Sequence, residues 1–213
     1  MVGYEGAERY LPADRSLQAL RSAARGCRGC DLYRDATQTV FGAGPSTAHV
    51  VLVGEVPGDR EDVTGRPFVG PAGALLDRAL DDAGIDRETV YVTNAVKHFR
   101  FSPADRGKRR IHMKPSRSQI VACHPWLVAE LAVLAPAVVV CLGATAAQSL
   151  LGKDFRVREQ RGLLLDGFAG ELPGAPRVLA TLHPSAVLRA PPEEREQAYA
   201  ELVADLHVVA KAI

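Results

Sequence analysis

Short apolar runs alternate along this chain with longer stretches in which apolar residues recur at helical spacing. Runs of the first kind predict buried strands, and they cover residues 49–53, 89–94, 137–142, 160–166 and 177–182. Stretches of the second kind predict helices, and they cover residues 14–24, 75–83, 116–134, 193–212 and a segment after Gly143. This alternation indicates an α/β fold, doubly wound, with a mostly parallel central sheet flanked by helices.

The run at residues 137–142 predicts the central strand of that sheet. It is continuous and rich in β-branched side chains, which fits a parallel strand covered on both faces. A chain of 213 residues is long enough for one well-buried core, so we predict a single domain over residues 1–213. Residues 1–12 carry little pattern and are expected to form a loosely held arm.

Composition narrows the class of protein. With 47% hydrophobic and 24% charged residues, the chain is typical of globular proteins rather than disordered or fibrous ones. The apolar stretch at residues 127–147 is divided by Glu130, Pro136 and Gly143, which favours core over a membrane span. The first residues show no basic start followed by an apolar run, so we expect a cytoplasmic protein. Nothing in the pattern demands more than a monomer.

Positive charge gathers in one segment. Residues 106–117 contain six Lys or Arg and no Asp or Glu, although the formal net charge of the chain is only +1. Polyanions such as nucleic acid are the usual partners of such a segment. A solvated loop is the other reading, and the charge run alone leaves both open.

Polar side chains follow three of the predicted strands. Glu55 and Asp59 come after the first strand, Asn94 ends the second, and His183 and Ser185 follow the last. Because the carboxyl ends of parallel strands share one edge of a sheet, we expect these groups to converge on one crevice. Each of them taken alone is equally explained as a turn or a backbone cap.

The cysteines suggest a metal or redox role. Cys27-x-x-Cys30 alone is compatible with thiol redox chemistry, zinc or an iron-sulfur cluster. A thioredoxin-like site expects this pair after a strand, whereas here it follows a predicted helix. Cys123 and His98 are the additional soft ligands outside the predicted strands, and Cys141 is expected to be a small buried core residue.

Five ordered motifs together resemble the iron-sulfur uracil-DNA glycosylases. After the Cys-x-x-Cys pair come Gly-Glu-x-Pro-Gly, Pro-Phe-Val-Gly-Pro, Tyr-Val-Thr-Asn-x-Val-Lys and His-Pro-Ser, which begin at Gly54, Pro67, Tyr91 and His183. The resemblance runs from about residue 27 to residue 189. The segment Lys-Arg-Arg-Ile-His at residues 108–112 further resembles the UdgX type, a branch close to the family four enzymes that becomes covalently attached to uracil-containing DNA.

The resemblance implies a [4Fe-4S] cluster. Its ligands would be Cys27, Cys30, His98 and Cys123. The standard iron-sulfur members have a cysteine at the place of His98, and imidazole replaces thiolate on some biological iron clusters. The alternative is a bystander histidine, with water or no cluster in its place.

The resemblance also implies a pocket for a base turned out of the DNA stack. Phe68 would stack on uracil, Asn94 would bind its polar edge, and His183 would donate to its O2 atom. The turn that begins at Gly54 would complete the substrate pocket through backbone groups, with Val56 and Asp59 counted among its residues. UdgX-type members usually have Gln at the position of Val56, so its amide near the nucleophile is missing here.

His112 would be the nucleophile that captures the sugar, with Glu55 orienting it or accepting its proton. A phosphate-contacting histidine in a basic loop is the alternative. The expected DNA contacts are Lys108, Arg109, Arg110, Ser185 and Arg189.

The sequence therefore predicts a glycosylase that excises uracil from DNA, accepts single strands, binds free uracil and stays attached to the abasic sugar through His112. The first rival is a hydrolytic iron-sulfur glycosylase that turns over. The second is a non-catalytic iron-sulfur protein that binds nucleic acid.

Overall fold

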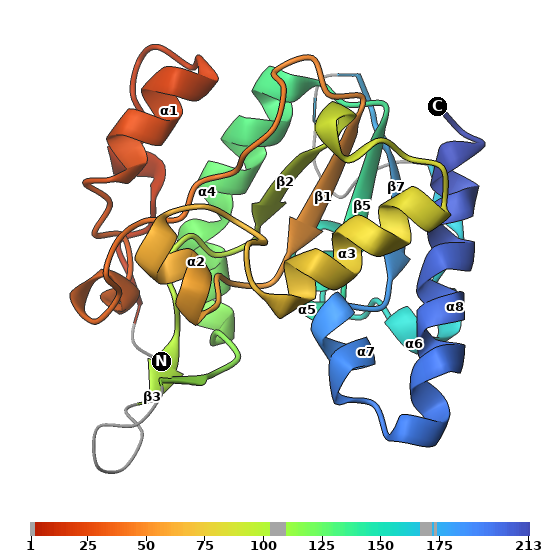
Figure 1. Ribbon diagram of the computed structural model, residues 1–213. Coiled ribbons are helices and arrows are strands. Elements are labelled where there is room, and N and C mark those ends of the chain that lie inside the picture. The colour runs from red at the N-terminus through yellow and green to blue at the C-terminus, as the bar shows by residue number, and fades with distance from the viewer. Residues whose placement is uncertain (1–2, 103–109, 167–171, 173) are drawn as a thin grey trace.

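A computed structural model describes residues 3–102, 110–166, 172 and 174–213 of the protein (Figure 1). Its main sheet has the strand order β2-β1-β5-β7-β6. Four of these strands are parallel, namely β1 (Val50–Gly54), β2 (Tyr91–Asn94), β5 (Val138–Leu142) and β7 (Arg177–Thr181). The edge strand β6 (Leu164–Leu165) runs antiparallel to β7. The predicted α/β fold with a mostly parallel sheet is confirmed.

Helices cover both faces of the sheet (Figure 1). One apolar core joins the sheet to α3 (Pro71–Asp82), α7 (Pro184–Arg189) and α8 (Pro192–Ala210). The other joins it to α4 (Arg117–Leu134), α5 (Ala144–Leu151) and α6 (Val157–Gln160). All of β5 is buried, as its continuous apolar run predicts.

The strand order places the predicted crevice at the carboxyl end of the sheet. β1 lies between β2 and β5, so the chain leaves β1 toward one side and returns later on the other. Ligands of open α/β sheets bind at such a switch point. The loops that follow β1, β2, β5 and β7 all emerge at this edge, which is the lower edge of the sheet in Figure 1.

Residues 1–12 were expected to form a loosely held arm; residues 1–2 lie outside the described residues, and two backbone hydrogen bonds anchor the middle of the remaining segment. The backbone N–H of Gly6 donates to Gly29 O at 3.0 Å, and that of Ala7 donates to Ala122 O at 2.8 Å. Gly29 permits this close approach, since a Cβ placed on it would lie 2.6 Å from Gly6 O. The segment continues through a 3-10 helix (Glu8–Tyr10) to α1 (Leu17–Ala24), whose first turn is capped by Ser16.

Several short elements depart from the predicted pattern. A helix, α2 (Asp59–Thr64), and a hairpin of β3 (Phe101–Ser102) with β4 (Ile111–His112) lie where loops were expected. Two further 3-10 helices span Asp31–Arg34 and Arg87–Thr89. These elements are too short to show a periodic apolar pattern. Within the described part of the chain, no helix is long and apolar enough to cross a membrane.

Candidate active site

Three predicted pocket residues meet at the carboxyl ends of β1 and β2. Gly54 and Asn94 are register partners in these neighbouring strands. A Cβ placed on Gly54 would overlap the Asn94 side-chain oxygen and lie 2.7 Å from Phe68 Cζ. Glycine at this position therefore lets the Asn94 amide and the Phe68 ring both lie close against the backbone of β1.

Phe68 has an unusual backbone conformation. Its φ of 55° lies in the left-handed region, which non-glycine residues seldom adopt. The following helix, α3, packs against this turn so closely that a Cβ on Gly73 would overlap the Phe68 carbonyl. Such strain persists only where the surroundings fix it, and it concentrates at binding sites.

His183 faces the same space from the end of β7. Its ring stacks on Phe68 with 6.3 Å between centroids and an interplanar angle of 25°. Its Nδ1 accepts from the backbone N–H of Ser185 at 3.1 Å and contacts the Ser185 hydroxyl at 2.8 Å. Burial lowers the pKa of His183 to about 4, with the nearby charges of Arg189 and His112 acting in the same direction. The neutral ring then carries its proton on Nε2, where it can donate to a carbonyl oxygen.

We expect His183 to remain neutral down to about pH 5. The depressed pKa means that the folded protein takes up this proton only as the pH falls through about 4. An NMR titration of the histidine ring signals, assigned with a His183→Gln variant, measures this directly. A midpoint near the ordinary histidine value of about 6.5 would contradict the burial of the ring.

Glu55 connects the end of β1 to the start of α5. Its carboxylate accepts a hydrogen bond from the hydroxyl of Thr145, in the first turn of α5. Its backbone carbonyl accepts from Val96 N at 3.1 Å. Sequence reasoning missed Thr145, because one threonine after a strand carries no signal of its own. The half-buried carboxylate is thus fixed at the carboxyl edge of the sheet.

His112 lies in β4 and approaches the same crevice. It is the register partner of Phe101, and its ring centroid lies 6.1 Å from that of Phe99. The residue remains accessible to solvent, but surrounding protein atoms desolvate its ring. This burial lowers the pKa of His112, the charge of Arg189 lowers it further, and the carboxylate of Glu55 opposes both. The site therefore favours a neutral imidazole beside a carboxylate.

Arg110 ties the hairpin to α2. Its guanidinium contacts Asp59 Oδ1 and the fully buried Asp62 Oδ2, each at 2.5 Å. It also lies over the rings of Phe99 and Phe101, 5.2 and 5.0 Å from their centroids. Asp59, counted beforehand among the substrate-binding residues, is placed by the structure in this anchor. His112 is two residues further along the chain, so the anchor holds its strand in place.

Val56 turns away from the base pocket. Its side chain is buried in an apolar cluster that includes Cys27, Cys30, Phe41 and Trp126. Its contribution to the pocket is therefore limited to its backbone groups.

The five predicted DNA contacts divide into three groups, and the first is Arg110, which lies in the anchor with Asp59 and Asp62. The Ser185 hydroxyl is hydrogen-bonded to His183. Arg189 is exposed at the end of α7, and its positive charge lowers the pKa of both His112 and His183. Lys108 and Arg109 lie outside the described residues.

The four predicted cluster ligands are all buried, and the three cysteines among them lie in one apolar cluster with α1. Cys123 Sγ accepts from Lys97 N at 3.3 Å, and Cys27 Sγ accepts from Trp126 Nε1 at 3.2 Å. Burial raises the pKa of Cys30 to about 11 and that of Cys123 to about 12, so free thiols here are protonated.

His98 is buried as well, and its Nε2 is 3.0 Å from Thr39 Oγ1. The donor types suit iron, but no three Cys, His, Asp or Glu side chains among the described residues are arranged as a metal-binding group. Cys141 is fully buried in β5, as expected for a core residue.

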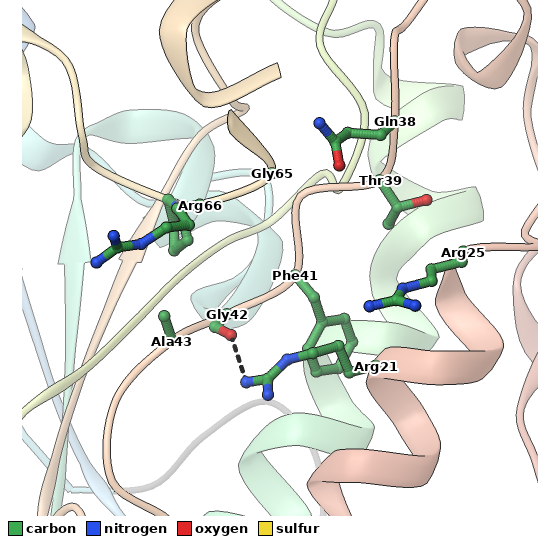
Figure 2. A pocket seen from close by; sticks show the side chains of 10 residues that line it. Arg21, Arg25, Gln38, Thr39, Phe41, Gly42, Ala43, Gly65 and Arg66 are labelled. Carbon is green, nitrogen blue, oxygen red and sulfur yellow. Dashed lines mark hydrogen bonds between the residues drawn. The ribbon is translucent and has the colours of Figure 1, made fainter. Parts of the chain in front are cut away.

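A separate cavity of about 310 Å³ lies beside α1 rather than at the crevice (Figure 2). Its lining includes Arg21, Arg25, Arg66 and Phe41. Arg21 donates to Gly42 O at 3.0 Å across it. This cavity contains none of the predicted catalytic residues.

Comparison with known proteins agrees with this arrangement. Residues 41–207 match the family model described as the uracil DNA glycosylase superfamily. A type-4 uracil-DNA glycosylase of Thermotoga maritima is 37% identical over 174 residues, which cover 81% of this chain and 83% of the relative. Type-4 uracil-DNA glycosylases of Pyrobaculum aerophilum and Archaeoglobus fulgidus are 36% and 37% identical, covering 82% and 78% of this chain and 86% and 79% of the relatives. The chain belongs to the uracil-DNA glycosylase superfamily.

Proposed function

We propose that this protein excises uracil from DNA. The observation that carries the proposal is that Asn94 and Phe68 both lie close to Gly54 at the carboxyl end of β1, while the His183 ring stacks on Phe68. Phe68 stacks on the extruded base, and Asn94 binds the polar edge that distinguishes uracil from cytosine. His183 donates from Nε2 to uracil O2 as negative charge develops there. The similarity to type-4 uracil-DNA glycosylases over most of the chain supports this activity.

We further propose that His112 captures the sugar. As the bond between C1′ and uracil N1 breaks, its electrons leave with the uracil anion, which His183 stabilises. A neutral nitrogen of His112 forms a new bond to C1′, and the proton on the other nitrogen passes to Glu55 or to solvent. The lowered pKa of His112 and its nearness to the Glu55 charge support this role.

A hydrolytic enzyme that releases an abasic site is the second candidate, favoured by the type-4 names of the relatives. Mass spectrometry after reaction with a short uracil-containing single strand separates the outcomes. A protein mass increased by the base-free oligonucleotide supports capture by His112. Free uracil with unmodified protein selects hydrolysis, and unchanged DNA refutes glycosylase activity.

We propose that Cys27, Cys30, His98 and Cys123 hold a [4Fe-4S] cluster. The two N–H donors to sulfur support this, because such bonds stabilise metal-bound thiolates, and burial disfavours thiolates without a metal. The cluster would join the segment after α1 to α4 and to the loop after β2. The four residues thereby fasten the N-terminal part of the chain to the elements that carry the hairpin.

We expect about four iron and four sulfide ions per chain in protein purified without oxygen, the stoichiometry of such a cluster. A Cys123→Ser variant should lose most of this iron, whereas Cys141→Ser, in β5, should retain it. A folded, colourless, metal-free wild-type protein would contradict the ligand assignment. The cytoplasmic location, the monomeric state and the acceptance of single strands stay predictions.

A further inference from the structure

A buried ion pair lies behind the base pocket, and the chemistry proposed above does not use it. Lys97 Nζ contacts the carboxylate of Glu130, and the two side chains are 1% and 0% exposed. Desolvation makes a buried pair of this kind no more stabilising than well-packed apolar side chains of the same volume. The pair therefore suggests a role other than stability.

Glu130 is held by two separate segments. Its carboxylate accepts from the hydroxyls of Tyr91 at 2.8 Å and Thr93 at 2.9 Å, and from Gly42 N at 3.1 Å. The carbonyl of Gly42 in turn accepts from Arg21, as Figure 2 shows. The carboxylate on α4 is thus fixed relative to β2 and to the chain that runs beside it.

Lys97 connects the fixed carboxylate of Glu130 to the backbone of Asn94. Its Nζ donates to the backbone carbonyl of Asn94 at 2.8 Å and to Thr93 Oγ1 at 2.7 Å. On the other side, Ala95 N donates to Gly54 O at 2.9 Å. The peptide group between Asn94 and Ala95 is therefore held through both its carbonyl oxygen and its N–H, and this fixes the direction in which the Asn94 side-chain amide leaves the strand.

We propose that Lys97, held by Glu130, is a positioning residue that aims the Asn94 amide at the base. This inference rests on the proposed function, in which Asn94 binds the polar edge of uracil. An apolar pair can fill the same volume, but it cannot hold the carbonyl of Asn94. A small rotation of that peptide moves the amide away from the plane of the base and weakens two hydrogen bonds at once.

The test needs variants that fold. Lys97→Met alone leaves a buried carboxylate without its counterion and is expected to unfold the protein. The double variant Lys97→Met with Glu130→Gln removes both charges and keeps the volume, and the glutamine oxygen still accepts hydrogen bonds. Tyr91→Phe is the matched control, because it removes another hydrogen bond to Glu130 without touching Asn94.

Two measurements decide the proposal. The first is the pair of side-chain amide signals of Asn94 in ligand-free protein, identified in NMR spectra by their loss in Asn94→Asp. The second is the single-turnover rate of uracil release per folded molecule. In the double variant we expect shifted or broadened Asn94 signals and a rate lower by about tenfold or more, with both unchanged in Tyr91→Phe.

Wild-type Asn94 signals and a wild-type rate in a folded double variant would overturn the proposal. Equal losses in Tyr91→Phe would also overturn it, since they would show a general effect of the cluster on stability. If the wild-type protein releases no uracil, the proposed function fails, while the amide signals still decide whether Lys97 positions Asn94.

Discussion

A His112→Ala variant is expected to form no complex with uracil-containing single-stranded DNA that survives heat and detergent, whereas the wild-type protein forms one. The variant lacks the nitrogen that would bond to C1′, while the base pocket of Phe68, Asn94 and His183 remains intact. We therefore expect it still to release uracil, with water in place of the imidazole. Denaturing gel electrophoresis of labelled DNA measures the complex, and chromatography measures free uracil.

His207→Ala is the matched control, since His207 is exposed on α8 and, among the described residues, its side chain hydrogen-bonds only to the backbone carbonyl of Val203. It should form the complex as the wild-type protein does. Equal persistence of the complex in His112→Ala would refute the assignment of the nucleophile.

Gly54→Ala is expected to reduce uracil release by about 100-fold or more, the effect of displacing reacting groups by about 1 Å. The added methyl group would overlap the Asn94 side-chain oxygen and lie 2.7 Å from Phe68 Cζ, so both must move out of the positions that bind the base. Single-turnover kinetics measure the rate, and circular dichroism checks the fold.

Gly26→Ala is the control for this substitution. A Cβ there would meet only Ala23 O, at an ordinary distance of 3.6 Å. Activity near the wild-type level in Gly54→Ala would show that the base does not lie against β1.

Residues whose roles depend on strand ends were predictable from the sequence. The apolar runs locate β1, β2, β5 and β7, and a parallel sheet must bring their carboxyl ends to one edge. Glu55, Asn94 and His183 follow from that rule alone. Phe68 required the resemblance, because its place depends on a turn that no apolar pattern marks.

Residues whose roles depend on tertiary contacts were not predictable. Arg110 is paired with Asp59 and Asp62, about 50 positions away in the sequence, so neither a local pattern nor a helical spacing reveals the anchor. The position of Asp59 after a strand predicts a role in the substrate pocket. The sequence does not show that Arg110 instead forms an ion pair with its carboxylate. The hairpin that carries His112 is indistinguishable from a loop in the sequence, because each of its strands has only two residues.

The left-handed backbone of Phe68 has a consequence for the encounter with DNA. The turn reaches this conformation during folding, where its packing against Gly73 offsets the strain. In the proposed function the aromatic wall is then already in place before any base arrives, and little conformational entropy remains to be lost on binding. A rigid wall also cannot adjust to a larger or differently shaped base. Preorganisation of this one residue therefore serves affinity and selectivity together.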